Sequence, residues 1–240
     1  MADQITLSQR LHEELKQIIS ETEPGGRLTP EPQLSKELGV SRATLREAMR
    51  TFEVQGLIHR RQGSGTYVMK PTHVIETGLE VLESIETISK RSGLRVTLGK
   101  LKIDEILANE EEARELGLDK DTPILKVSRV IFADNRPVAF LVDILPQRVI
   151  SRDLISIDFK GSILDLLMQQ GNLELANSRT EIGATGASQE MARALNIQRG
   201  NALLRLISWL YTVDGQVVDH SFSYFLPGYF RFHVVRELER

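Results

Sequence analysis

Three arginines recur at intervals of four residues in the first quarter of the chain: Arg42, Arg46 and Arg50. Side chains four apart share one face of a helix, so a helix here would carry a single cationic ridge. A guanidinium group can bind phosphate oxygens or the edge of guanine, and a bidentate guanine contact is worth roughly 1–3 kcal/mol of base discrimination. Arg60 and Arg61 place two further cations nearby. The spacing predicts chemistry suited to nucleic acid.

The residues around these arginines predict two helices that would position them. A short helix is expected over 31–38, and Gly39 begins a tight turn after it. A second helix is expected over about 42–55, with the Ser41 hydroxyl placed to accept a free backbone N–H at its start. Its apolar side chains, spaced by three and four, are Leu45, Ala48, Met49 and Phe52. That stripe would face a core and leave the arginines outside.

Two short strands, over 57–61 and 66–69, are expected after the second helix. The connection over 62–65 reads Gln-Gly-Ser-Gly, so backbone N–H groups at its tip can approach phosphates without obstruction by side chains. Helix, tight turn, basic helix and glycine-tipped hairpin are typical of a winged helix-turn-helix. A solvated arginine face on a structural helix is the alternative interpretation.

The charge distribution agrees with a local nucleic-acid site. Residues 41–70 hold six Lys or Arg and two Glu, whereas the chain as a whole has a net charge of −3. A positive patch of this kind can bind DNA even when the whole protein is slightly acidic.

Two runs in this region resemble the N-terminal domain of GntR-family bacterial transcription regulators. They are Leu-Gly-Val-Ser-Arg-Ala-Thr-Leu-Arg-Glu-Ala over 38–48 and Gln-Gly-Leu-Ile-His-Arg-Arg-Gln-Gly-Ser-Gly-Thr-Tyr-Val over 55–68. The resemblance implies DNA contacts from Arg42, Thr44 and Arg46 in the second helix and from Gln62 and Gly63 at the tip of the wing. Many members carry a DNA-contacting arginine where this chain has Pro32. The predicted DNA-binding residues are Ser41, Arg42, Thr44, Arg46, Arg50, Arg60, Arg61, Gln62, Gly63, Ser64 and Gly65.

The composition narrows the class of protein. The chain has 240 residues and 41% hydrophobic content, enough for two modest cores, and no cysteine for disulfides, thiol chemistry or cysteine metal sites. Neither a signal peptide nor an apolar run of membrane-spanning length is evident, so a cytoplasmic protein without membrane contact is expected. We expect a DNA-binding domain over 1–70, a linker over 71–78 that runs into a helix, and a second domain over 79–240.

The second domain has the pattern of an α+β fold with a mainly antiparallel sheet. A helix over about 8–22 precedes the DNA-binding motif as scaffold, and a helix is expected over 73–92. Strands are expected over 96–106, 124–133, 138–145, 173–184, 202–213 and 216–225, and short capped helices over 110–116, 163–170 and 188–195.

The second domain shows no catalytic motif. The five histidines lack metal-ligand spacing, and no phosphate-binding loop, dinucleotide fingerprint or nucleophile elbow occurs. We therefore expect no catalytic residue, no metal and no cofactor. A DNA reader joined to such a domain suggests a sensor for a small molecule.

Three runs of the second domain resemble the UTRA effector-binding domain, which places the chain with the HutC-like branch of the GntR family. They cover 123–139, 145–146 and 213–221. The resemblance implies a fold like that of chorismate lyase, a small-metabolite effector and dimer contacts. The effector-binding residues that it implies are Ser84, Glu86, Arg129, Asp143, Ser162, Asp219 and Tyr224.

Three departures from the family pattern bear on the effector. Glu86 stands where phosphosugar-binding members have a hydroxyl residue, Ile131 where they often have arginine, and Leu141 where they often have glutamate. A carboxylate would repel a phosphate, and the two apolar residues would make the cavity less polar. We expect an effector that is not a sugar phosphate, with an amine-bearing or largely apolar molecule as the hypothesis.

Structural roles are open to the same residues. Arg129 could serve only to pair with Asp143 or Glu86, and Ser162 only to cap a helix. Asp219 and His220 are neighbours on an expected strand, so at most one of them lines a cavity.

The sequence predicts a homodimeric repressor that reads a palindromic operator and responds to a small effector. Two other classes stay open. One is a chorismate-lyase-like enzyme, with Arg129 binding a carboxylated substrate and Glu86 moving protons. The other is an architectural DNA binder that ignores metabolites.

Overall fold

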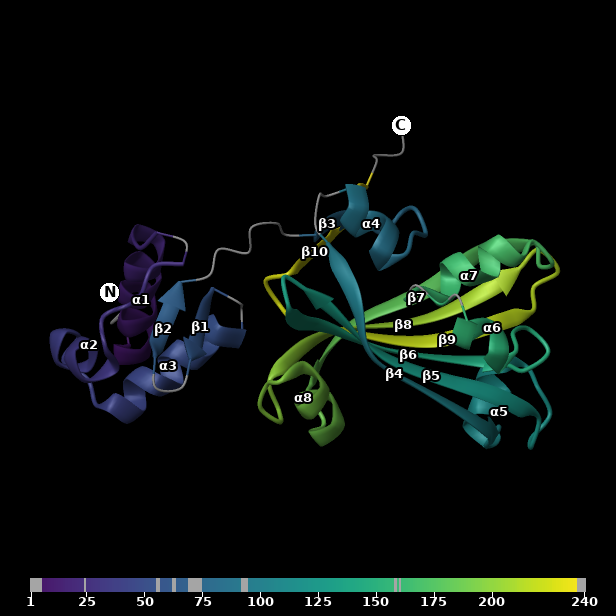
Figure 1. The fold of residues 1–240 in the computed structure, drawn as a ribbon, viewed down its shortest axis with the longest axis horizontal. Coiled ribbons are helices and arrows are strands. Elements are labelled where there is room, and N and C mark those ends of the chain that lie inside the picture. The colour runs from purple at the N-terminus through teal and green to yellow at the C-terminus, as the bar shows by residue number, and fades with distance from the viewer. Residues whose placement is uncertain are drawn as a thin grey trace, which may run out of the picture. The chain divides into compact units, whose positions relative to one another are not determined.

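The computed structural model describes residues 6–23, 25–54, 57–61, 64–68, 75–91, 95–157, 159 and 161–236. The chain forms two compact units, labelled by element in Figure 1. Unit 1 comprises Met1–Val74 with Pro227–Tyr229, and unit 2 comprises Ile75–Leu226 with Phe230–Arg240.

Unit 1 contains the predicted winged helix-turn-helix. Its helices are α1 (Leu7–Glu21), α2 (Glu31–Glu37) and α3 (Arg42–Val54), and its antiparallel wing strands are β1 (Ile58–Arg61) and β2 (Gly65–Val68). A capping box between Thr6 and Gln9 begins α1. The segment before α2 extends the wing, because the N–H groups of Gly25 and Leu28 each donate to a β2 carbonyl at 2.8 Å.

The core of unit 1 joins all of these elements. Leu45, Met49 and Phe52 are buried as predicted, and Ala48 packs against them half-buried. The other buried members are Leu11, Leu15, Ile19, Leu28, Leu34, Ile58 and Val68. Burying one stripe of α3 leaves its opposite face to solvent, so the core fixes which arginines are presented.

Unit 2 is built on one antiparallel sheet of six strands, in the spatial order β4-β5-β6-β9-β8-β7. The strands are β4 (Val96–Leu107), β5 (Pro123–Ala133), β6 (Arg136–Pro146), β7 (Leu175–Gly186), β8 (Ala202–Thr212) and β9 (Val217–Phe225). Asp134 and Asn135 both adopt positive φ, which suits the tight β5–β6 turn. The predicted α+β class and the antiparallel sheet are confirmed.

Helices cover both faces of this sheet (Figure 1). On one face, α6 (Arg152–Ile157) and α7 (Ile163–Gln170) bury Ile155 and Leu167 against Leu125 and Val127 of β5. On the other face, α5 (Glu110–Leu116) and α8 (Gln189–Leu195) contact β6, and α5 also contacts β9. The caps predicted at Asn109 and Ser162 are confirmed, and Ser188, predicted as the first residue of its helix, is the N-cap of α8. Helix α6 was not predicted.

The helix expected over 73–92 is wrong. Residues Ile75–Gly78 form strand β3, and the helix α4 is confined to Ile85–Arg91. Strand β3 pairs in parallel with β10 (Phe230–His233), more than 150 residues away in the sequence. Apolar residues spaced by three and four suggested a helix, but this distant pairing overrides local propensity. The segment expected to be a linker thus contributes a strand to unit 2.

Candidate functional site

The recognition helix α3 presents a polar face opposite its core stripe. Ser41 caps α3, since its Oγ accepts the Thr44 backbone N–H at 3.1 Å, and the two hydroxyls lie 2.8 Å apart. Arg42, Thr44 and Arg46 are exposed. Arg50 pairs with Glu47 at 3.0 Å, one turn back on the same helix. Their contacts with DNA stay a prediction.

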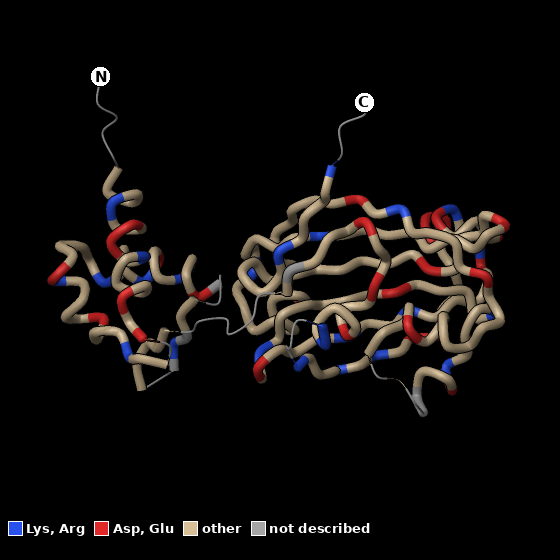
Figure 2. The backbone as a smooth tube through the Cα atoms, turned by 90° about the horizontal axis from the view of Figure 1, so that it is seen from above, with Lys and Arg blue, Asp and Glu red and all other residues tan. Residues whose placement is uncertain are grey.

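Glu31 connects the recognition helix to the wing. Its two carboxylate oxygens lie 2.7 Å from Arg46 Nε on α3 and 3.1 Å from Arg60 on β1. The Glu31 side chain is only 16% exposed, whereas that of Arg46 is 64% exposed. Figure 2 shows that unit 1 carries acidic as well as basic residues. Glu31 therefore orients two of the predicted DNA-binding arginines.

The described part of the wing shows why glycine occupies position 65. Gly65 has φ of +122°, and a Cβ there would lie 2.5 Å from the Arg27 Nε. Ser64 and Tyr67 hydroxyls lie 2.8 Å apart. Arg61 belongs to β1, but its side chain, like Gln62 and Gly63, lies outside the described residues.

Arg27 and Glu31, which contact the wing and the predicted DNA-binding arginines, were not identified from the sequence. Arg27 lies against the wing because it forms a bridge with Tyr67 of β2, which no local pattern reveals. Glu31 had a visible signal, since it precedes two cationic segments, but its bridging role depends on the packing of α2 on α3.

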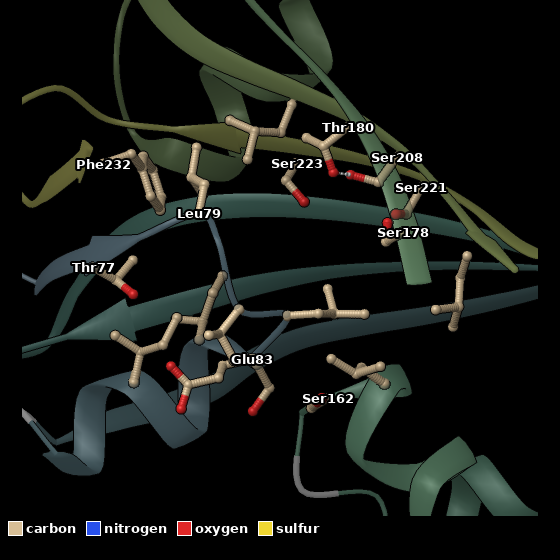
Figure 3. A pocket seen from close by; sticks show the side chains of 18 of the residues that line it. Thr77, Leu79, Glu83, Ser162, Ser178, Thr180, Ser208, Ser221, Ser223 and Phe232 are labelled. Carbon is tan, nitrogen blue, oxygen red and sulfur yellow. Dashed lines mark hydrogen bonds between the residues drawn. The ribbon is translucent and has the colours of Figure 1, made fainter. Parts of the chain in front are cut away.

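Unit 2 contains a cavity of about 570 Å³ on the sheet face that carries α7. The segment from β3 to α4 lies across it, and Ser162 and Leu164 of the α7 region close one side. Strands β7, β8 and β9 provide a wall of small hydroxyl side chains, shown in Figure 3. These are Ser178, Thr180, Ser208, Ser221 and Ser223.

Four ionisable side chains form what we call the carboxyl cluster: Glu86, Arg129, Asp143 and Asp219. Arg129 and Asp143 form a buried ion pair between β5 and β6. Burial, and next Asp143, raise the pKa of Asp219. Burial also raises the pKa of Glu86 and of Asp143, and Arg129 opposes both rises.

Three atoms of this cluster have no hydrogen-bond partner within the described structure: Glu86 Oε1, Arg129 Nε and Asp219 Oδ1. Unpartnered buried polar atoms are costly, and each one in a folded protein calls for an explanation. A small molecule bound in the cavity would supply partners for these atoms.

Six of the seven residues predicted for the effector line this cavity: Ser84, Glu86, Arg129, Asp143, Ser162 and Asp219. Their roles in binding stay a prediction. Both serines also cap helices, since Ser84 Oγ accepts the Thr87 N–H and Ser162 Oγ accepts the Asp165 N–H, each at 3.0 Å. The predicted pairing of Arg129 with Asp143 is present as well.

The prediction for Tyr224 is wrong. Tyr224 stacks on Phe140, with ring centroids 6.3 Å apart, while its neighbours Ser223 and Phe225 line the cavity. Side chains alternate along a strand, so Tyr224 points to the other face. For the same reason Asp219 lines the cavity and His220 stacks on Trp209 at 4.9 Å. Leu141 lines the cavity as expected, but Ile131 is fully buried and not part of the lining.

Asp219→Asn should raise the thermal stability of the ligand-free protein at neutral pH. The pKa of Asp219 is raised above its ordinary value of 3.8, so the folded state binds this proton more tightly than the unfolded state does. The resulting stabilisation is complete below the unfolded pKa and is lost as pH rises through the folded pKa. Asparagine keeps the shape without the charge, so Tm should rise by a few degrees near pH 7, about 2–4 °C for each kcal/mol.

The matched control is Asp214→Asn in the β8–β9 hairpin. The Thr212 hydroxyl lowers the pKa of that exposed carboxyl, so its effect on stability should have the opposite sign. Thermal unfolding followed between about pH 4 and pH 8 separates the two. A lower Tm for Asp219→Asn across this range would show that the carboxylate stabilises the fold.

The described residues offer few alternatives to a DNA face and an organic-ligand cavity. No described group of three or more His, Cys, Asp or Glu could hold a metal ion. No helix in the described ranges is long and apolar enough to cross a membrane.

Comparison with known proteins identifies both units. Residues 7–68 match the family described as bacterial regulatory proteins, gntR family, and residues 91–231 match the UTRA domain. The chain is 30% identical over 223 residues to the HTH-type transcriptional repressor NagR of Bacillus subtilis, covering 91% of this chain and 90% of that protein. It is 26% identical to the mannosyl-D-glycerate transport/metabolism system repressor MngR of Escherichia coli, covering 96% and 94%.

Among solved structures, PhnF from Mycobacterium smegmatis has the same fold, with a TM-score of 0.64, 22% identity, and coverage of 95% of this chain and 100% of that one. The chain therefore belongs to the GntR family of bacterial regulatory proteins, as a DNA-binding transcription regulator with a UTRA effector-binding domain.

Proposed function

We propose that this regulator is a homodimeric repressor whose operator binding is weakened by a small molecule in the cavity of unit 2. Each subunit would place α3 and its wing on one half of a palindromic operator. The observation that carries the proposal is the cavity, whose volume of about 570 Å³ lies in the range of small-molecule sites. Two similar proteins named as repressors support the sign of regulation.

The order of elements along the chain supports coupling between the two functions. Strand β3 is the first element after the DNA-binding unit, and its Thr77 and Gly78 line the cavity. A ligand that contacts β3 therefore contacts the first described strand that follows the DNA-binding unit in the sequence. Coupling between two binding sites is typically worth about 1–3 kcal/mol, or roughly 5–150-fold in affinity.

The charges of the lining argue against a sugar phosphate. Arg129 is the one basic side chain among the described lining residues, and Asp143 already neutralises it. Five acidic residues line the same cavity: Glu80, Glu83, Glu86, Asp143 and Asp219. A phosphate would enter this site without a free cation to compensate its desolvation.

We also propose that the protein is not an enzyme. The similar proteins are named as regulators. A lyase acting on a carboxylated substrate needs a cation to balance that carboxylate, and Asp143 already compensates the charge of Arg129, although the Nε of Arg129 has no hydrogen-bond partner in the described structure. Incubation with chorismate should therefore give no product.

The test is operator binding by fluorescence anisotropy, using DNA upstream of the protein's own gene and hits from a thermal-shift screen of metabolites. We expect one ligand to raise Tm and to lower operator affinity by at least about fivefold. A ligand that tightens operator binding would make the protein a co-repressor system. If no stabilising ligand changes the operator affinity, the result would favour the alternative of an architectural DNA-binding protein that does not respond to metabolites.

Glu31→Gln should reduce the preference for operator over random DNA by about tenfold, while binding to random DNA grows stronger. The substitution removes a negative charge near the phosphates and loosens the guanidinium of Arg46, and a well-placed arginine–guanine contact is worth roughly 1–3 kcal/mol. Glu47→Gln is the control, because it removes the same charge but frees only Arg50. An unchanged operator preference in Glu31→Gln would contradict the orienting role, as would an equal loss in both variants.

A further inference from the structure

The carboxyl cluster has more negative than positive groups, and this imbalance indicates what the cavity binds. Three carboxyls surround one guanidinium, and Arg129 influences the pKa of all three. Asp143 takes the direct ion pair. Glu86 and Asp219 are left without a cation of their own within the described lining.

Asp219 is a buried member of the cluster with one unpartnered carboxylate oxygen. Its side chain lines the cavity, the residue is only 7% exposed, and Oδ1 has no hydrogen-bond partner in the described structure. The Ser221 hydroxyl and the Ile144 backbone amide contact this carboxyl and lower its pKa, but burial outweighs them. A cation brought by a ligand would supply the missing partner and make the ionised form favourable.

The wall beside Asp219 suits a ligand with N–H donors. Thr180 and Ser208 hydroxyls lie 2.9 Å apart and lie with Ser178, Ser221 and Ser223 on one wall of the cavity (Figure 3). Hydroxyls accept hydrogen bonds without adding charge, so they can complete the shell of an ammonium group.

Apolar side chains from the β3 and β10 segments also line the cavity, beside the carboxylate of Glu80. Leu79 and Phe232 lie together there, from the β3 and β10 segments (Figure 3). The lining residues Val81, Leu82, Ile182 and Val234 are between 48% and 67% exposed. Exposed apolar side chains in the lining of a polar cavity can contact an apolar part of a ligand.

We propose that this cavity takes an amphiphilic amine, with its ammonium group at Asp219 and Glu86 and its apolar body against the β3–β10 rim. The inference rests on the function proposed above, which it refines by naming the chemical class of the effector. An apolar body seated on β3 would also place the ligand on the segment that leads to the DNA-binding unit.

The probes that test this are amine and alcohol pairs with one skeleton: octylamine with 1-octanol, and 2-phenylethylamine with 2-phenylethanol. Trp209, the single tryptophan of the chain, stacks on His220 on the sheet face opposite the cavity, so binding is measured by isothermal titration calorimetry and not by fluorescence. Titration of the full-length protein should show each amine binding at least about tenfold more tightly than its alcohol, a difference of about 1.4 kcal/mol.

Variants locate the amine. Asp219→Asn and Glu86→Gln should each lower amine affinity by about tenfold and leave alcohol affinity unchanged within about twofold. Glu83→Gln is the matched control, because Glu83 also lines the cavity but already pairs with Arg91 at 2.7 Å. Circular dichroism establishes that each variant is folded. Equal binding of amines and alcohols, or amine affinity that survives both substitutions, would overturn the proposal.

The outcome is separable from the function proposed above. If a neutral or carboxylated ligand releases operator DNA and no amine binds, the proposed repressor function stands and the proposal of an amine effector is wrong. Amine binding that requires Asp219 but leaves operator affinity unchanged would keep the amine site and contradict its role as the regulatory effector.

Discussion

The buried ion pair between Arg129 and Asp143 is the interaction on which the electrostatics of the cavity in unit 2 depend. Arg129 joins β5 to β6 through Asp143 and moderates the charge of Glu86 and Asp219. One cation cannot neutralise three buried carboxyls, and an uncompensated charge in a low-dielectric site is strongly unfavourable. Burial of these carboxyls therefore carries a cost that a ligand with a complementary positive charge would reduce. A regulator needs a ligand that prefers one of its conformations, and an electrostatic cost confined to the empty state supplies such a preference.

The second constraint is the pairing of β3 with β10. Two segments far apart in the sequence form a parallel pair at the mouth of the cavity, and Ile75 is buried there. A short strand pair is marginal on its own and depends on what packs against it. Ligand atoms against Leu79 and Phe232 would add to that packing. Strand β3 can thus respond to a ligand in the cavity without any change in the six-stranded sheet, in which three of the five strand pairings join ten or eleven residue pairs.

Local signals predicted most of the fold. Capped helices such as Asn109–Leu116 carry a complete set of start and stop residues, and the hairpin at Asp214 and Gly215 carries its own turn. The prediction of a helix over 73–92 was wrong because residues 75–78 form strand β3, whose partner strand β10 lies near the other end of the chain. The prediction that Tyr224 lines the cavity was wrong for a different reason. The family resemblance indicated the correct strand, but neighbouring residues of a strand point to opposite faces of the sheet, so an error of one residue places the side chain on the wrong face. Glu31 and Arg27 could not be placed at all without the packing of α2 and the wing.

In both units, ion pairs with a carboxylate hold arginine side chains in place. In unit 1, the carboxylate of Glu31 orients Arg46 and Arg60, and in unit 2 Asp143 orients Arg129. A planar guanidinium loses much side-chain freedom when it binds, and a fixed carboxylate removes part of that freedom beforehand. The consequence differs with burial. On unit 1, the side chain of Arg46 is 64% exposed, so part of its guanidinium stays open to solvent beside the pair with Glu31. In the buried site of unit 2, Asp143 compensates the charge of Arg129, so under our proposal the cation of the ligand would be bound by Glu86 and Asp219.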